Sequence, residues 1–237
     1  MYVTITKDSN KALEILKQGR VAAFPTGTSY GLAVDALQGH ALQRLRNLKR
    51  RPAEKTFTVF MDPSLYDTFL ELTGAERALL KQLRQKPLTL LVKPKQSLVH
   101  LAQDDLIGLR VIDHPLMAAL AERAGVPLTA TSANLAGGPP CFSPDGVLKT
   151  FPGRLPDEYL DEENPAGSHG TTYDLSLGVI LDGGNLPVSE PTTIAKLVDD
   201  DAIEIIRLGA LAPAALRGAA TGLAVKRPKP AASEGRP

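Results

Sequence analysis

The sequence predicts an α/β protein: a single domain built on an open, twisted, mixed sheet with helices on its faces. Segments with helical spacing of apolar residues alternate along the chain with short aliphatic runs, the pattern of helices and strands packed in layers. Hydrophobic residues make up 43% of the 237 residues, whereas aromatic residues make up 5% and Trp is absent, which favours an aliphatic core. A chain of this length can bury a substantial core within one domain.

In the first half of the chain, a strand follows each expected helix. The segment SNKALEILKQG places its leucines on one face, with Ser9 or Asn10 as the cap and Gly19 as the stop. Leucines recur at helical spacing in HALQRLRNLKR, and GAERALLKQLRQ predicts a further long helix. The expected elements are helix 9–19, strand 21–24, helix 40–50, strand 56–61, helix 74–85 and strand 88–94.

In the second half, LIGLRVI, HPLMAALAERAG and PLTATSA form a strand–helix–strand unit, and three strand-like runs follow later. The acidic segment 154–170, with two prolines and no apolar periodicity, is expected to be a loop. The domain is expected to span residues 1–210, with 211–237 as a tail that is weakly helical and then disordered. The expected elements are strand 106–112, helix 114–125 and strands 127–133, 175–181, 192–198 and 202–209.

The composition excludes several classes of protein. The 27 Lys and Arg residues nearly balance the 26 Asp and Glu residues, so no global field demands nucleic acid or a membrane surface. A single cysteine excludes an internal disulfide and fits a reducing compartment. The sequence has no signal-peptide pattern and no run long enough to span a bilayer, so we expect a cytoplasmic protein without a membrane partner. The four histidines lack metal-ligand spacing, so no protein-bound metal is predicted.

Three stretches carry polar residues that could form a site. FPTGTSYGLAVDA crowds small, hydroxylated and glycine residues after a strand, as either a tight connection or a pocket wall would. In LKRRPAEKTF, Pro52 moves Arg51 out of helical geometry, so that Lys49 and Arg51 can converge. These cations suit a polyphosphate or a nucleic-acid backbone, or they form a solvated helix end. In PLTATSANLAGGPP, Ser132 and Asn134 could hold an anion or a purine edge, or form an ordinary turn.

In this order and spacing, the three stretches resemble the YrdC-like family. The matching patterns are P-T-x-T-x-Y-G-L, K-x-R and S-x-N, followed by an arginine shortly before a glycine at Arg207 and Gly209. GLRVIDHP is similar to the family's A-V-R-x-x-x-H-P segment and places Arg110. The resemblance covers residues 21–209. It implies threonylcarbamoyl-AMP synthase activity, in which L-threonine, bicarbonate and ATP give threonylcarbamoyl-AMP and pyrophosphate for threonylcarbamoyladenosine formation in tRNA.

The resemblance also assigns roles to residues. ATP is then a substrate, Mg²⁺ rides on its phosphates, and the further partners are tRNA or tRNA-modification proteins. The reaction needs no protein nucleophile, so the residues position substrates, neutralise charge and exclude water. The nucleotide-binding candidates are Lys49, Arg51, Lys55, Ser132, Asn134 and Arg207, of which Lys49 and Arg51 are also the catalytic candidates. The threonine-binding candidates are Thr28, Tyr30, Arg110 and Thr192.

The chain departs from the family pattern at three places. Gly27 stands where synthases usually carry glutamate, Phe60 stands where histidine is frequent, and SEPTTI replaces G-x-x-S-T-I. Because FTVF and PTTI are similar to the YciO branch, a YciO-type nucleotide hydrolase is an alternative. A double-stranded RNA- or tRNA-binding module that uses the basic run 44–55 is another. Only the synthase requires threonine and bicarbonate for pyrophosphate release, so this requirement distinguishes it from the hydrolase and from the RNA-binding module.

Overall fold

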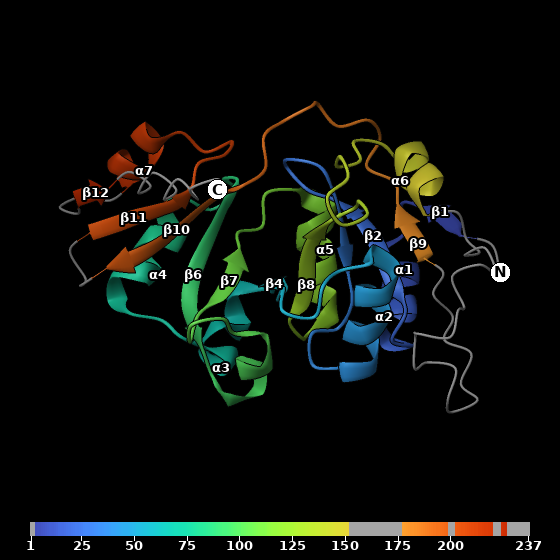
Figure 1. Cartoon of the computed structure of the whole chain (residues 1–237), viewed down its shortest axis with the longest axis horizontal. Helices are drawn as coiled ribbons and strands as arrows, with labels where there is room; N and C mark the ends of the chain where they lie inside the picture. The colour runs from blue at the N-terminus through green and yellow to red at the C-terminus, as the bar shows by residue number, and fades with distance from the viewer. Residues whose placement is uncertain (1–2, 152–176, 199–201, 220–223, 227–237) are drawn as a thin grey trace, which may run out of the picture.

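The computed structural model describes residues 3–151, 177–198, 202–219 and 224–226 (Figure 1). The strands are β1 (Thr4–Thr6), β2 (Val21–Pro25), β3 (Tyr30–Ala33), β4 (Thr58–Phe60), β5 (Leu70–Glu71), β6 (Leu88–Pro94), β7 (Ile107–Arg110), β8 (Leu128–Ser132), β9 (Leu177–Leu181), β10 (Thr193–Val198), β11 (Ala202–Arg207) and β12 (Ala224–Lys226). The α-helices are α1 (Ser9–Lys17), α2 (Gly39–Lys49), α3 (Tyr66–Phe69), α4 (Gly74–Gln82), α5 (Pro115–Ala124), α6 (Pro144–Thr150) and α7 (Pro213–Ala219). Two short 3-10 helices are η1 (Pro63–Leu65) and η2 (Gln96–Leu101).

The described strands form one mixed sheet, which confirms the predicted fold class. Their order is β1-β9-β2-β3-β8-β4-β7-β6-β10-β11-β12, with β5 pairing to β6 outside this path. Neighbours such as β1 and β9 are parallel, whereas β2 and β3 or β6 and β7 are antiparallel. The sheet is open, because its edge strands β1 and β12 lie at opposite ends of the molecule (Figure 1).

Strand β2 shows why the run VAAFP is apolar at every position. All five of its residues are buried. Val21 and Ala23 pack in the cluster that contains the buried leucines of α2, whereas Ala22 and Phe24 pack in a second cluster with residues of α1 and α5. A strand that is covered on both faces loses the apolar–polar alternation of a half-buried strand. The helices therefore form layers on both sides of the sheet at this point.

The helix starts follow capping rules, with one difference from the prediction. Asp8 caps α1, since its carboxylate accepts a hydrogen bond from the Asn10 amide at 2.9 Å, so the expected caps Ser9 and Asn10 were wrong. Helix α5 begins as predicted at His114 and Pro115, and the His114 Nδ1 atom accepts a hydrogen bond from the Leu116 amide at 3.2 Å. Proline fits this first turn because its missing N–H has no partner in a helix.

The residues after position 210 are partly built into the core. In α7, Leu216 is fully buried and belongs to the larger apolar cluster, and β12 extends the sheet by pairing in parallel with β11. The expected domain boundary at 210 stays a prediction. Residues 154–170 and 227–237 lie outside the described residues, so the acidic loop and the disordered end also stay predictions. None of the described helices is both long enough and apolar enough to cross a bilayer.

Candidate active site

A cavity of about 410 Å³ opens where several strands end. It lies between two groups of elements: the β2–β3 turn with β3 and β8 on one side, and β6, β7 and β10 with the segment before β10 on the other. Its lining residues are Phe24, Thr26, Thr28, Ser29, Tyr30, Gly31, Arg51, Thr58, Thr89, Arg110, Ala130, Thr131, Ser132, Pro140, Ser189, Pro191, Thr192, Ile194 and Arg207. Seven of the ten residues predicted to bind substrates are among them, and Lys49, Lys55 and Asn134 are not.

The β2–β3 turn is both a tight connection and a cavity wall. Thr26 Oγ1 donates a hydrogen bond to the Ser29 carbonyl at 2.7 Å and accepts one from the Thr28 amide at 3.2 Å. These bonds hold the turn closed, so the Thr28 side chain is fixed at the cavity. Tyr30 also lines the cavity, but its hydroxyl donates to the Gly184 carbonyl and accepts from the Gly183 amide, both at 2.9 Å. These two hydrogen bonds connect the cavity wall to residues 183 and 184. Burial raises the pKa of the hydroxyl.

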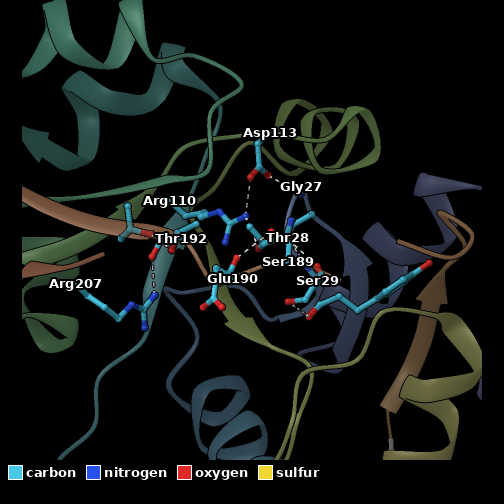
Figure 2. Close-up of polar contacts among 12 residues, drawn as sticks. Gly27, Thr28, Ser29, Arg110, Asp113, Ser189, Glu190, Thr192 and Arg207 are labelled. Carbon is cyan, nitrogen blue, oxygen red and sulfur yellow. Dashed lines mark hydrogen bonds and ion pairs between the residues drawn. The ribbon is translucent and has the colours of Figure 1, made fainter. Parts of the chain in front are cut away.

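Arg110, at the end of β7, lies against this turn (Figure 2). Its Nη2 atom donates to Thr28 Oγ1 at 3.3 Å and to Asp113 Oδ2 at 2.8 Å. Only 11% of the arginine side chain is exposed, and its Nε atom is buried without a hydrogen-bond partner. The guanidinium thus keeps donor capacity that the protein does not use.

Thr192 and Arg207 form the opposite wall (Figure 2). Thr192 Oγ1 shares a hydrogen bond with Thr89 Oγ1 at 2.9 Å, and Arg207 Nη2 donates to the Thr192 carbonyl at 2.9 Å. A Cβ atom on Gly209 would lie 2.0 Å from the Pro191 carbonyl oxygen. Gly209, two residues after Arg207, therefore lets the chain that carries Pro191 and Thr192 pack directly on the end of β11.

The two cations of K-x-R contact different groups. Lys49 is 2% exposed at the end of α2, and its Nζ atom donates to the carbonyl oxygens of Ser132 and Asn134 and, at 3.1 Å, to Asn134 Oδ1. Burial, followed by the charge of Arg51, lowers the pKa of Lys49 to about 7. Arg51 instead lines the cavity, with Nη2 donating to the Thr56 carbonyl at 2.6 Å and its guanidinium over the Phe57 ring.

The S-x-N loop is held by Lys49 and by its own side chains. Ser132 Oγ donates to Asn134 Oδ1 at 2.5 Å, and Asn134 Nδ2 donates to the Gly138 carbonyl at 2.6 Å. Ser132 reaches the cavity, whereas Asn134 organises the loop behind it. Lys55 is exposed and does not line the cavity, and its carbonyl accepts hydrogen bonds from Arg46 and Arg51.

The charge of the lining favours an anionic ligand. Among the described residues that line the cavity, three are arginines and none is acidic. Burial lowers the pKa of Arg51 and of Arg207, and a neighbouring guanidinium adds to the effect in each case: Arg46 beside Arg51, and Arg110 beside Arg207. A bound anion would offset this repulsion. The described residues contain no group of three or more His, Cys, Asp or Glu side chains placed to hold a metal ion.

Two residues near the cavity were not candidate site residues in the sequence analysis: Phe60, which was noted only as a departure from the family pattern, and Asp113, which was not singled out. Phe60 is fully buried, does not line the cavity and packs against Phe24, with ring centroids 5.0 Å apart. It therefore supports the cavity from behind. Asp113 contacts Arg110 and the β2–β3 turn, and its only sequence signal was its position beside Arg110 in GLRVIDHP.

The fold and site define an α/β protein with an arginine-lined cavity at the strand ends of an open mixed sheet. The chain belongs to the Sua5/YciO/YrdC family, whose model, described as "Telomere recombination", matches residues 14–209. The threonylcarbamoyl-AMP synthase of Haemophilus influenzae (strain 86-028NP) is 35% identical over 163 residues, which cover 65% of this chain and 88% of that protein. That of Escherichia coli O6:H1 is 34% identical over 153 residues, covering 61% and 80%. The family resemblance predicted from the motifs is confirmed.

Solved structures support the fold. P. abyssi Sua5 complexed with L-threonine matches with a TM-score of 0.75 at 21% identity, covering 95% of this chain. This chain spans 63% of the length of that Sua5 chain. E. coli YciO matches with a TM-score of 0.66 at 24% identity, covering 91% of this chain and 98% of that one.

Proposed function

We propose that this protein is a threonylcarbamoyl-AMP synthase that converts L-threonine, bicarbonate and ATP into threonylcarbamoyl-AMP and pyrophosphate, for threonylcarbamoyladenosine formation in tRNA. The observation that carries the proposal is that one cavity gathers the residues assigned to both substrates. Thr28, Arg110 and Thr192 lie on its walls together with Arg51, Ser132 and Arg207. The curated relatives with this activity, at 34–35% identity, support the same assignment.

The chemistry requires positioning more than covalent catalysis. Threonine's amine and bicarbonate give N-carboxythreonine and water; its carboxylate then attacks the α-phosphorus of ATP, the new P–O bond forms, and the bond to pyrophosphate breaks. Arg110 binds the threonine carboxylate, since a guanidinium matches a carboxylate in geometry and charge. Arg51 and Arg207 neutralise the phosphates as charge develops on the leaving group. Walls of hydroxyl and apolar groups exclude water from the carbamate.

Lys49 acts through the S-x-N loop. Its ammonium donors are directed to the oxygens of Ser132 and Asn134, so it fixes the loop from which Ser132 reaches the nucleotide. The described lining offers hydroxyl groups and no carboxylate, so Mg²⁺ would be held by the phosphates of ATP, whose charge it would help to neutralise.

A nucleotide hydrolase of the YciO type is the second candidate. Its support is the structural match that covers 98% of E. coli YciO, together with the segments FTVF and PTTI, which are similar to the YciO branch. A hydrolase would use water in place of N-carboxythreonine in the same arginine-lined cavity.

The test is pyrophosphate release by the purified protein with ATP, Mg²⁺, L-threonine and bicarbonate. We expect release to require both threonine and bicarbonate, and serine to be used ~10–200-fold less efficiently because one methyl contributes only ~1–3 kcal/mol. Nucleotide hydrolysis at the same rate without threonine would instead support the hydrolase. Binding of double-stranded RNA without turnover would support an RNA-binding module.

A further inference from the structure

Asp113 joins the two walls of the cavity that carry the proposed threonine site. Its carboxylate is 2% exposed. Oδ2 accepts a hydrogen bond from Arg110 Nη2 at 2.8 Å, and Oδ1 accepts one from the Gly27 amide at 2.9 Å (Figure 2). One buried carboxylate thus connects the end of β7 with the β2–β3 turn, which are far apart in the sequence.

Gly27 is glycine because of this carboxylate. A Cβ atom at position 27 would lie 2.7 Å from Asp113 Oδ2 and 2.8 Å from its Cγ atom. The backbone at Gly27 does not have a positive φ, so space and not backbone conformation requires glycine here. The carboxylate of Asp113 therefore occupies the volume that a side chain at position 27 would need.

The ion pair between Asp113 and Arg110 also fixes the position of the Arg110 guanidinium at the cavity. Burial lowers the pKa of Arg207 and the nearby charge of Arg110 adds to the effect, so an unbalanced guanidinium at position 110 would add to the positive charge of the cavity. Asp113 offsets that charge and fixes Nη2, which also reaches Thr28 Oγ1 at 3.3 Å. The position of the Arg110 guanidinium is therefore fixed before a ligand binds.

We propose that Asp113 is a positioning residue, which holds Arg110 and the Thr26–Ser29 turn in a single arrangement for binding the carboxylate of the amino-acid substrate. The proposal rests on the proposed synthase function for its substrate, and on geometry alone for the coupling of Asp113, Arg110 and Gly27.

The kinetic test uses Asp113→Asn, which is nearly isosteric, and Asp113→Ala. Because hydrogen bonds to charged groups contribute more than neutral ones, we expect KM for threonine to rise ~10-fold or more, with KM for ATP changed less than ~2-fold. The control is Asp67→Asn, which removes an exposed carboxylate paired with Arg77 outside the cavity and should leave both constants unchanged. Equal increases in both KM values, or no change in either, would overturn the positioning role.

A double-mutant cycle tests the contact with Gly27. Gly27→Ala should raise KM for threonine in the wild-type background, because its Cβ displaces the carboxylate. In the Asp113→Ala background the same change should cost much less, since the contacts at 2.7 and 2.8 Å are removed and the nearest remaining group of residue 113 is its carbonyl oxygen at 3.2 Å. A Gly27→Ala effect of the same size in both backgrounds would contradict the proposal.

Hydrogen exchange separates this proposal from the proposed function. Loss of the Asp113 carboxylate should speed amide exchange of the 26–29 turn, relative to Asp67→Asn, whether or not the protein releases pyrophosphate. If the wild type shows no threonine-dependent activity but the Asp113 variants still exchange faster at residues 26–29, the synthase function is refuted and the coupling is retained. An active wild type whose 26–29 exchange is the same after Asp113→Asn and Asp67→Asn would refute the coupling and retain the synthase.

Discussion

At the scale of single residues, Lys49 and Arg51 of K-x-R have different surroundings, although the sequence assigned the same role to both: Lys49 contacts the S-x-N loop and Arg51 lines the cavity. Arg50 lies between them with φ of +50°, a left-handed conformation that ends α2 and turns the chain. Lys49 therefore stays on the buried side of the helix with the S-x-N loop, and Arg51 reaches the cavity. Lys49 contacts Ser132 and Asn134, whereas Arg51 contacts Thr56 and Phe57 and lines the cavity, so that the joint binding of a ligand by both cations stays a prediction.

Arg51→Ala should lower the rate of pyrophosphate release by ~10²-fold or more, the effect of removing a preorganised charge-stabilising donor. Arg51→Lys should restore only part of the rate, because an ammonium lacks the planar fork that binds phosphate at two points. Arg50→Ala is the matched control, since Arg50 is exposed and does not line the cavity. Equal losses for Arg50 and Arg51 that both disappear in moderate salt would indicate a diffuse basic patch and favour RNA binding.

At the scale of secondary-structure elements, we expect the stability of the N-terminus of α5 to depend on pH. The His114 Nδ1 atom must be unprotonated to accept the Leu116 amide, and burial lowers the pKa of this histidine, with Asp113 acting in the opposite direction. A folded-state pKa below the unfolded value of about 6.5 means that the unfolded chain binds more protons. The stability provided by this cap is therefore present at neutral pH and is lost as the pH falls below about 6.5.

His114→Asn should remove that loss, because asparagine is a good N-cap without a titrating group. We expect the free energy of unfolding in urea to fall less between pH 7.5 and 5.5 in this variant than in the wild type. His114→Ala should lower the stability at pH 7.5 by about 1 kcal/mol through loss of the cap. His40→Asn, an exposed substitution on α2, is the control. An unchanged pH dependence in His114→Asn would show that another group causes the acid sensitivity.

Elements with a sequence period were predictable, and those made by tertiary contacts were not. The leucine repeats of α2 and α4 and the apolar run of β2 marked these elements correctly. Helix α6 has seven residues and depends on the Ser143 cap and Pro144, too short for a repeat to show. Strand β5 has two residues and exists because it pairs with β6. Asp113 acquires its role only when β7 and the β2–β3 turn are brought together, which no local pattern encodes.

At the scale of the whole molecule, the cavity lies between two parts of one sheet. The β2–β3 turn and β8 form one wall, and β6, β7 and β10 form the other, although they are separated in the strand order by β4. The chain between β9 and β10 passes from one part to the other (Figure 1), and its residues Ser189, Pro191 and Thr192 line the cavity. A ligand that fills the site therefore contacts both parts at once.

Such a ligand should stabilise the molecule as one cooperative unit. A non-hydrolysable ATP analogue at ~100 times its Kd should add ~2.7 kcal/mol, which raises Tm by about 5–10 °C for a chain of this size. L-threonine should add its own increment, because it contacts different residues of the same cavity. Arg51→Ala should abolish most of the nucleotide shift and leave the threonine shift in place, which distinguishes a phosphate contact from general damage to the fold. A Tm that rises with double-stranded RNA and is unaffected by nucleotide or threonine would show that the arginine-lined cavity is not the functional site.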